Sequence, residues 1–522
     1  MNKTTRAISM VTVLLIIIKL LGFIREMIVA AYYGATYQTD AYNMAILILG
    51  LSTALISTGF ATVIVPMYNN KRIHESKDVA DAFTSNILCI TSLFYVLISI
   101  FGIITAPLLV RIFAPDFDID TFKLTINIIR ITFIFTIAIN ISNFMTFIMQ
   151  IHGKFSITVV ANFPFSIFTV VSIVLFSDKI GIYALVIGYI LFLFTQVLIL
   201  VLYARKTFKF KYIINFTNNE LKEVLKLSFP VYISVAVWEI NIIIDKVLAS
   251  GLSEGSISLI MYASKLRSLP DSIITASVIM VIFPLLSKYA AQKEFALLKT
   301  TVNKTISFLF MVLFPVIAIS IYYAEEITRI VYERGVFTAN ETALTANLFA
   351  FAIISLIFTG VSSLINNLFY SIQDTITPQI AAIIMFASNI LFNLLLIRHM
   401  QAAGLVLATS IASFIYFIVS IIQFRLKCGA FGGFGLLKNI FKYFTATLGM
   451  VSSFFLLEIF RNRLTLFLFF SISAIISLCI YIFLLYLLKA ELFTQATVQI
   501  KIFFNNQLKR IDYETVNKNN EN

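Results

Sequence analysis

The chain has 522 residues, of which 60% are hydrophobic and only 12% are charged. Soluble globular domains hold about 45–50% apolar and about 25% charged residues, so a soluble protein is excluded and a polytopic membrane protein is predicted. A net charge of +13 would suggest nucleic-acid binding in a soluble protein. Here the basic residues gather in short segments between apolar runs, as cytoplasmic loops of membrane proteins do, and we expect no nucleic-acid partner.

Apolar runs that could cross a bilayer recur along the whole chain, since a spanning helix needs about 20 mostly apolar residues. We therefore expect an all-α polytopic membrane protein with about fourteen transmembrane helices. The predicted spans are residues 8–33, 41–67, 83–108, 125–150, 156–177, 181–203, 223–249, 258–287, 303–323, 344–370, 379–397, 403–424, 437–459 and 464–488. The first is a helix and not a cleaved signal peptide, because its apolar run continues through Lys19 without a small-residue cleavage site.

The distribution of Lys and Arg between the spans predicts the orientation of the chain. Basic residues mark one set of helix ends, around Lys71, Lys154, Arg205 and Lys288, whereas the alternate loops are poor in them. One of those alternate loops, residues 114–120, is acidic. Both termini are therefore expected on the cytoplasmic side.

A weak internal repeat relates EMIVAAYYGATYQTDAYNMA at 26–45 to DKVLASGLSEGSISLIMYA at 245–263. Each runs from an acid through a Gly-containing loop to an aromatic residue and Ala. Six spans separate the two copies, so the halves share one orientation, as parallel repeats do. The predicted parts are an N-terminal six-helix bundle at 1–212, a C-terminal six-helix bundle at 213–428, two additional transmembrane helices at 429–490 and a polar cytoplasmic tail at 491–522.

Ionisable residues inside the predicted spans gather in three helices. They are Lys19, Arg25 and Glu26 in the first span, Glu239, Asp245 and Lys246 in the seventh, and Lys265 and Arg267 at the start of the eighth. Such residues usually face a bundle interior or an aqueous cavity and mark a pathway. Lys19 and Glu26 are seven positions apart and so lie nearly on one stripe of a helix, as do Glu239 and Lys246. We expect the two net-basic faces to enclose a polar cavity.

Two sets of candidate site residues follow. Those expected to line the cavity are Lys19, Arg25, Glu26, Asp40, Lys246, Lys265 and Arg267, and those expected to bend or gate it are Gly22, Gly34, Glu239 and Asp245. A basic cavity in apolar surroundings suits an anionic, lipid-like substrate, because guanidinium groups match phosphate oxygens two at a time. The alternatives are that Arg25 and Glu26 only pair, that Lys265 and Arg267 snorkel to an interface, and that Asp40 caps a helix.

Enzymatic motifs are missing from the sequence, so an enzyme is not expected. The chain contains no G-x-x-x-x-G-K-[ST] phosphate loop, no H-E-x-x-H and no G-x-S-x-G. Its cysteines, Cys89, Cys428 and Cys479, form no CxxC or Cys/His cluster, so no metal site and no cofactor are expected. Coupling to a membrane potential or an ion gradient stays open.

Three short motifs resemble the lipid II flippase (MurJ/MviN) family. The first is LGFIRE followed by VAAYYGATYQTDAY, at 21–42. The second is LASGLSEGSISLIMYASKLRSLP at 248–270 with FPLLSKYA at 283–290. The third is ERGVFTANET at 333–342 with LFYSIQDTITPQ at 368–379. The similarity covers most of residues 10–425.

The resemblance implies two six-helix bundles plus two helices with a lipid-facing groove, the fold of the multidrug/oligosaccharidyl-lipid/polysaccharide exporter superfamily. It also implies that undecaprenyl-pyrophosphate-linked peptidoglycan precursor moves from the inner to the outer leaflet of the bacterial cytoplasmic membrane by alternating access. Membrane lipids would be neighbours, cell-wall synthesis proteins would be candidate partners, and the protein would act as a monomer.

Carried over by position, Arg25 matches the family's first-helix arginine, and Lys19 stands where many members have arginine. Glu26 and Asp40 match acidic positions, and Lys265 stands where a basic residue opens helix eight. The chain departs from the family at residues 48–60, which carry no charge where many members have an arginine pair and an acid, and at Ser268, where members often have an acid. A gate built from those ion pairs cannot exist here in the same form.

Other readings stay open. The uncharged second helix favours a flippase of the same superfamily for another undecaprenyl-linked glycan of capsule, teichoic or O-antigen type. A drug or cation antiporter on this fold would want a cavity dominated by carboxylates, and the one predicted here is basic.

Overall fold

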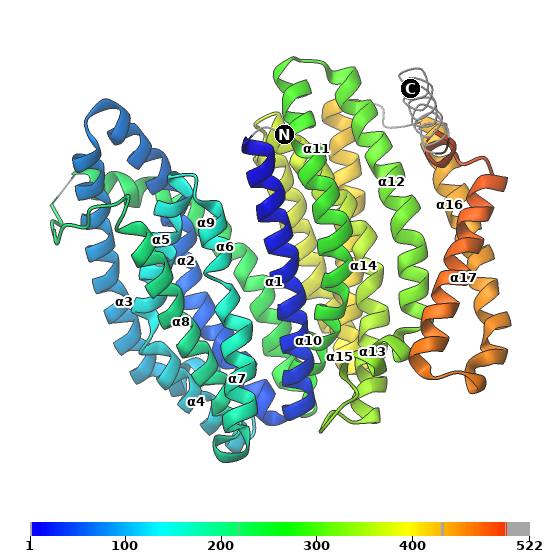
Figure 1. Cartoon of the computed structure of the whole chain (residues 1–522), viewed down its shortest axis with the longest axis horizontal. Helices are drawn as coiled ribbons and strands as arrows, with labels where there is room; N and C mark the ends of the chain where they lie inside the picture. Colours follow the sequence, from blue (N-terminus) through cyan, green and yellow to red (C-terminus); the bar gives the residue numbers. More distant parts are fainter. Residues whose placement is uncertain (1–2, 218, 430–432, 496, 498–522) are drawn as a thin grey trace, which may run out of the picture. The chain divides into compact units, whose positions relative to one another are not determined.

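The computed structural model describes residues 3–217, 219–429, 433–495 and 497; the side chains of 3–13, 54–62, 230–242 and 462–463 lie outside the described part as well. Helices account for all the regular structure in these ranges (Figure 1). The first nine are α1 (Lys3–Tyr33), α2 (Tyr37–His74), α3 (Lys77–Phe113), α4 (Ile119–Phe133), α5 (Thr136–Ile151), α6 (Phe155–Val160), α7 (Phe163–Ile180), α8 (Tyr183–Ala204) and α9 (Asn219–Ser250).

The remaining helices begin with a nearly continuous run that contains one π-helical turn. They are α10 (Ser256–Pro270), the π-turn η1 (Asp271–Thr275), α11 (Ala276–Ala291), α12 (Phe295–Tyr322), α13 (Ala324–Tyr332), α14 (Ala339–Ser371), α15 (Ile376–Cys428), α16 (Gly433–Leu457), the 3₁₀ turn η2 (Glu458–Arg463) and α17 (Leu466–Leu487). The π-turn directly follows Pro270, which has no backbone N–H to donate. The π-turn lies within the predicted eighth span, residues 258–287.

Helix ends follow local sequence signals. Ser76 begins α3 by accepting a hydrogen bond from the Val79 backbone N–H, and Asp118 begins α4 by accepting from Asp120 and Thr121. Gly181 ends α7 and Gly429 ends α15, both with positive φ. Between such ends the apolar runs stay helical, because a bilayer offers no water to satisfy backbone groups.

Each predicted span corresponds to a helix or a broken helix. Within the described ranges, nine helices are long and apolar enough to cross a membrane, and ten if the pair α4 and α5, bent by 50°, is one span. The long α15 covers two predicted spans, since its backbone leaves helical geometry at Gln401. The three remaining predicted spans, residues 8–33, 41–67 and 223–249, correspond to α1, α2 and α9. The short α13 was not expected.

The helices form two compact units. Unit 1 holds residues 1–262 and 332–342, and unit 2 holds residues 263–331 and 343–522. This division groups residues that are in contact in space. The boundary predicted at 212/213 instead divides the sequence between the two repeats, and it stays a prediction.

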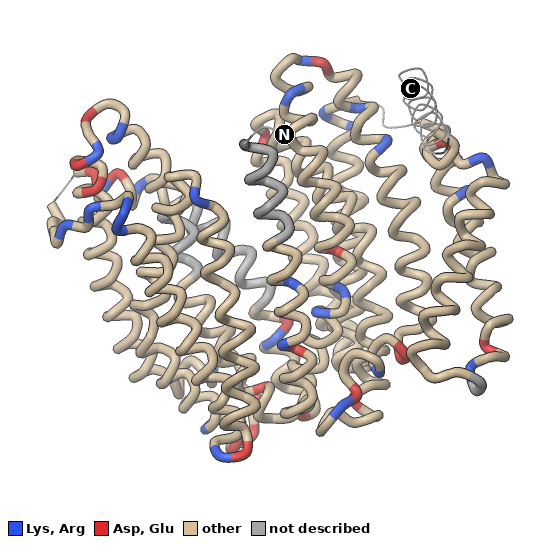
Figure 2. Tube along the Cα trace, in the orientation of Figure 1, with Lys and Arg blue, Asp and Glu red and all other residues tan. Residues whose placement is uncertain are grey.

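Unit 1 is built around α2, which packs against α3, α4, α5 and α9. Polar side chains fix its interior. Tyr68 donates its hydroxyl to Asp81 at 2.9 Å, and Asn140 donates to Thr91 at 3.2 Å and to Ser92 at 3.0 Å. Charged residues on α3 lie at its ends, and the long stretch between them is uncharged (Figure 2). This pattern is that of a spanning helix.

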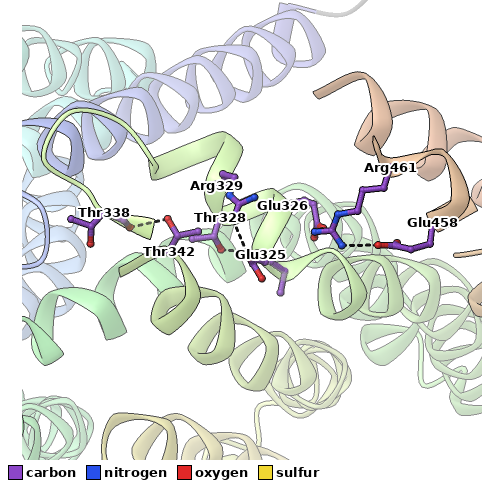
Figure 3. A network of polar contacts seen from close by, with 9 residues as sticks. Glu325, Glu326, Thr328, Arg329, Thr338, Thr342, Glu458 and Arg461 are labelled. Atoms are coloured by element: carbon purple, nitrogen blue, oxygen red, sulfur yellow. Dashed lines mark hydrogen bonds and ion pairs between the residues drawn. The ribbon is translucent and has the colours of Figure 1, made fainter. Parts of the chain in front are cut away.

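In unit 2, α16 and α17 pack against each other and against α12. A polar network fastens this hairpin to α13 (Figure 3). Arg461 of η2 contacts Glu326 of α13 at 2.7 Å and Glu458 at 2.6 Å, and Glu326 is only 5% exposed. The guanidinium therefore neutralises a buried carboxylate across two elements that are distant in sequence.

Candidate functional site

Three segments of unit 1 that are far apart in sequence meet at the turn between α1 and α2. They are residues 31–40, 254–262 and 332–341, and together we call them the clasp. Each carries part of one of the three family-like motifs, and the first two also carry the loops of the predicted repeat. The repeated segments are thus in direct contact.

Asp40 is the most buried acid of the clasp, with 5% of its surface exposed. Its carboxylate accepts hydrogen bonds from the backbone N–H of Gly255 (2.9 Å) and from the backbone N–H (2.8 Å) and hydroxyl (2.6 Å) of Ser258. These donors belong to the first turn of α10, where unpaired N–H groups and the helix dipole favour an anion. Asp40 does cap a helix, but the helix is α10 and not its own.

Two further carboxylates hold the same turn. Glu341, near the start of α14, accepts from the backbone N–H of Ala35 and from Thr338, whose N–H lies at 2.6 Å and hydroxyl at 2.9 Å. Glu254 accepts from the Tyr37 backbone N–H at 2.9 Å. The chain between α1 and α2 is therefore fixed through its backbone by acids from two other segments.

Two glycines permit the close approach of these segments. Gly255 and Gly335 have φ of +82° and +59°, and a Cβ at either would lie 2.1 Å from a carbonyl oxygen, that of Ala35 or Ala31. The Val336 backbone N–H also donates to the Ala31 carbonyl at 2.9 Å. Any side chain at Gly255 or Gly335 would push the segments of the clasp apart.

Aromatic residues fill the space beneath these backbone contacts. The Tyr262 hydroxyl donates to the Gly34 carbonyl at 3.0 Å, and the Tyr332 hydroxyl donates to the Tyr262 carbonyl at 3.3 Å. The rings of Tyr262 and Tyr332 lie 5.0 Å apart, and the ring of Phe337 lies 5.7 Å from each. Gly34, a predicted gating residue, is therefore part of the clasp.

The charged residues of α1 precede the clasp segment 31–40 along the same helix (Figure 2). Arg25 contacts Glu26 at 2.6 Å, both largely buried, and the Arg25 guanidinium lies 4.0 Å from the centre of the Phe165 ring of α7. Lys19 is exposed, and a Cβ at Gly22 would meet no atom within 4 Å. The pairing of Arg25 with Glu26, named above as an alternative to a cavity role, is present, and the guanidinium also lies against an aromatic face.

The charges of the seventh predicted span lie on α9. Asp245 and Lys246 are half-buried, and the Lys246 ammonium lies 3.7 Å from the Met261 sulfur of α10. The side chain of Glu239 lies outside the described residues. Lys246 thus sits in unit 1 beside the last turns of the clasp segment 254–262.

Lys265 and Arg267 lie in unit 2. Arg267 donates from Nε to the Ser355 hydroxyl at 2.7 Å and from Nη2 to the Thr359 hydroxyl at 2.8 Å, both on α14. It is therefore held against a neighbouring helix and does not extend to an interface as a snorkelling side chain would. Lys265 is half-buried. Their participation in one cavity with the residues of α1 stays a prediction.

Glu254 and Glu341 were not identified as site residues from the sequence. Thr338 and Glu341 have the spacing of a capping box, which predicts where α14 begins. Neither that spacing nor the acid at 254 indicates a contact with the turn after α1, because such contacts depend on tertiary structure. The family-like motifs were the only signal that these segments act together.

The comparisons with known proteins agree with one another. A sequence profile describing the lipid II flippase MurJ family matches residues 29–497. The chain is 26% identical over 402 residues to a probable lipid II flippase MurJ of Rickettsia prowazekii, covering 76% of this chain and 79% of the relative. It is 28% identical over 421 residues to the lipid II flippase MurJ of Thermosipho africanus, covering 78% and 84%.

Solved structures give the same result. A lipid II flippase MurJ in an inward closed conformation superposes with a TM-score of 0.77 at 26% identity, covering 91% of this chain and 97% of that one. A multidrug transporter of the MATE family in an inward-facing conformation superposes with a TM-score of 0.62 at 16% identity, covering 81% of this chain. The second likeness shows the shared fold alone.

Proposed function

Because the chain belongs to the lipid II flippase MurJ family, we propose that it carries lipid II from the inner to the outer leaflet of the bacterial cytoplasmic membrane. The observation that supports this most is the clasp, in which the three family-like motifs meet around Asp40. The predicted orientation puts the clasp on the outer side and both termini in the cytoplasm. A closed clasp would then seal the outer end of the substrate path.

The proposed path begins at the basic residues. Arg25 would bind the pyrophosphate, because its planar guanidinium can donate two hydrogen bonds to phosphate oxygens at once. Its contact with Glu26 would hold the side chain in place until an anion competes for it. Lys19, three residues before Gly22 and exposed, would attract the anion from the cytoplasmic side. Lys265 would contribute a further positive charge.

Alternating access follows if the clasp opens. Many of its contacts are hydrogen bonds from backbone N–H groups to carboxylates, which water can replace once the segments separate. Opening would release the head group outside, while the prenyl chain stays in the bilayer. The absence of charge at residues 48–60 means that this chain must rely on the clasp where relatives can use ion pairs of the second helix.

A second candidate is a flippase for another undecaprenyl-linked glycan, which the same uncharged stretch favours. The test expresses this chain in bacteria whose own lipid II flippase can be switched off, and measures lipid II in the outer leaflet. We expect export by the wild-type chain and loss of export by Arg25→Ala at equal membrane abundance. Lipid II retained inside by the wild-type chain would refute the lipid II assignment and leave the second candidate.

A further inference from the structure

The segment that follows α8 forms an unusual hook in unit 1. Residues 208–215 have no regular secondary structure, yet their backbone is fixed along α3. Three backbone N–H groups donate to side chains of α3: Lys209 to Asp81 at 3.1 Å, Lys211 to Ser85 at 3.1 Å and Asn215 to Asn86 at 2.7 Å. All three donors are at odd-numbered positions. This is typical of an extended chain, in which successive residues alternate between two faces.

The alternation gives the hook one apolar face. Its even-numbered side chains, Phe208, Phe210, Tyr212 and Ile214, line a cavity of about 540 Å³. The other walls come from α3, α5 and α8, among them Leu93, Ile141 and Val201. This volume falls within the range of about 300–1,000 Å³ typical of ligand sites. The cavity lies within unit 1, apart from the clasp residues and from the charges of α1.

The rim of the cavity is basic. Arg205 lines the cavity and is exposed, and Lys206, its neighbour in the chain, is exposed as well. Lys209 and Lys211 are exposed too, but as odd-numbered residues of the hook they belong to its other face. Lys209 pairs with Asp78 at 3.5 Å, and the Lys206 ammonium lies 5.6 Å from the Tyr203 ring. Arg205 forms no ion pair within the described part of the chain. The cavity thus combines hydrocarbon walls with a cation at its edge.

We propose that this cavity binds an anionic glycerophospholipid of the inner leaflet, with an acyl chain between the hook and α3 and the phosphate beside Arg205. The predicted orientation places these helix ends at the cytoplasmic interface, where the leaflet is anionic. Phe210 and Tyr212, 53% and 79% exposed, suit an interfacial aromatic belt. Leu93 and Val201, 42% and 38% exposed, open the cavity toward hydrocarbon.

The site goes beyond the proposed function, because it does not depend on which molecule is flipped. Its chemistry suits a bound membrane lipid. The apolar walls can pack against an acyl chain, and the charge at the rim can bind a phosphodiester at the membrane surface. The prenyl chain of a lipid-linked substrate is the competing occupant, and the experiment separates the two.

The test uses the full chain in phosphatidylcholine vesicles and a tryptophan reporter. The single Trp238 is replaced (Trp238→Phe), and Leu93→Trp places the reporter in the cavity. Phe101→Trp, also on α3 and 63% exposed but not lining the cavity, is the matched control. Quenching by acyl-brominated phosphatidylglycerol is compared with quenching by acyl-brominated phosphatidylcholine. Phe210→Trp serves as a second cavity reporter if Leu93→Trp fails to fold.

At the cavity reporter, phosphatidylglycerol should bind more tightly than phosphatidylcholine by roughly five-fold per contributing cation. The ratio should be near one at Phe101→Trp, and Arg205→Gln should bring the cavity ratio to near one. Equal quenching by both lipids at the cavity reporter would overturn the proposal. So would unlabelled undecaprenyl phosphate relieving the quenching better than unlabelled phosphatidylglycerol, since the cavity would then hold a prenyl chain.

Discussion

Removing the Asp40 carboxylate should open the clasp. Asp40→Ala deletes the acceptor for two backbone N–H groups and one hydroxyl at the start of α10. A hydrogen bond to a charged group contributes about 1.5–3 kcal/mol, so loss of the two backbone donors alone costs about 3 kcal/mol. Since each 1.4 kcal/mol is a factor of ten, the open population should rise roughly 100-fold.

The assay measures how fast a buried cysteine in the clasp reacts with a membrane-impermeant maleimide in intact cells. Ser256→Cys is suitable because Ser256 is 2% exposed and differs from cysteine by one atom. The native Cys89, Cys428 and Cys479 are replaced by serine first. Labelling tracks the open population when opening and closing are fast. We expect slow labelling with Asp40 present and labelling faster by roughly 100-fold, or to saturation, in Asp40→Ala.

Asp118→Ala is the matched control. Asp118 also caps a helix and is predicted to lie on the same side of the membrane, but it accepts its hydrogen bonds from Asp120 and Thr121 of its own helix, which lie outside the clasp. Its loss costs about 0.5–2 kcal/mol locally and should leave labelling of Ser256→Cys unchanged. If Asp40→Ala leaves the cysteine as protected as before, the carboxylate does not hold the clasp closed and the reasoning is refuted.

Three further outcomes are expected. Lys265→Ala should reduce lipid II export while Lys265→Arg preserves it, and normal export by both would make Lys265 an anchor without a substrate role. Arg461→Ala should lower the melting temperature more than Arg461→Lys, because it leaves the buried Glu326 unpaired; equal melting temperatures would contradict this. The hydrogen bond from Lys427 lowers the pKa of Asp374 from 3.8 to about 2, so this contact stabilises the fold above about pH 4 and is lost as pH falls toward 2. Lys427→Gln should reduce the loss of stability between those pH values, and an unchanged pH profile would rule the contact out.

The sequence predicted the helices well because membrane spanning leaves a strong local signal. The bilayer requires long apolar runs, and the kink at Gln401 and the break after Pro270 lie where polar residues or proline interrupt such runs. The 50° bend between α4 and α5 was not expected, since TFIF at 132–135 is as apolar as its surroundings. Apolar runs mark spans but do not show where a helix bends.

The candidate site was predicted less completely. The charges of α1 stood out because ionisable residues are rare at membrane depth, but the pairing of Arg25 with Glu26 was only one of the interpretations left open. The partners of Asp40 could not be predicted, because they are two backbone N–H groups and one hydroxyl more than 200 positions away. Backbone donors have no side-chain signature, so the clasp became visible only in three dimensions.

Locking the clasp tests the account most directly. The Asn43 amide donates to the Ser258 hydroxyl at 3.1 Å, so Asn43→Cys with Ser258→Cys is the pair to cross-link, and formation of the disulfide is verified by thiol titration before transport is measured. The account predicts that oxidation stops lipid II from reaching the outer leaflet and that reduction restores export, while each single-cysteine variant exports under both conditions. Continued export with the disulfide fully formed would show that transport does not pass through an opening of the clasp.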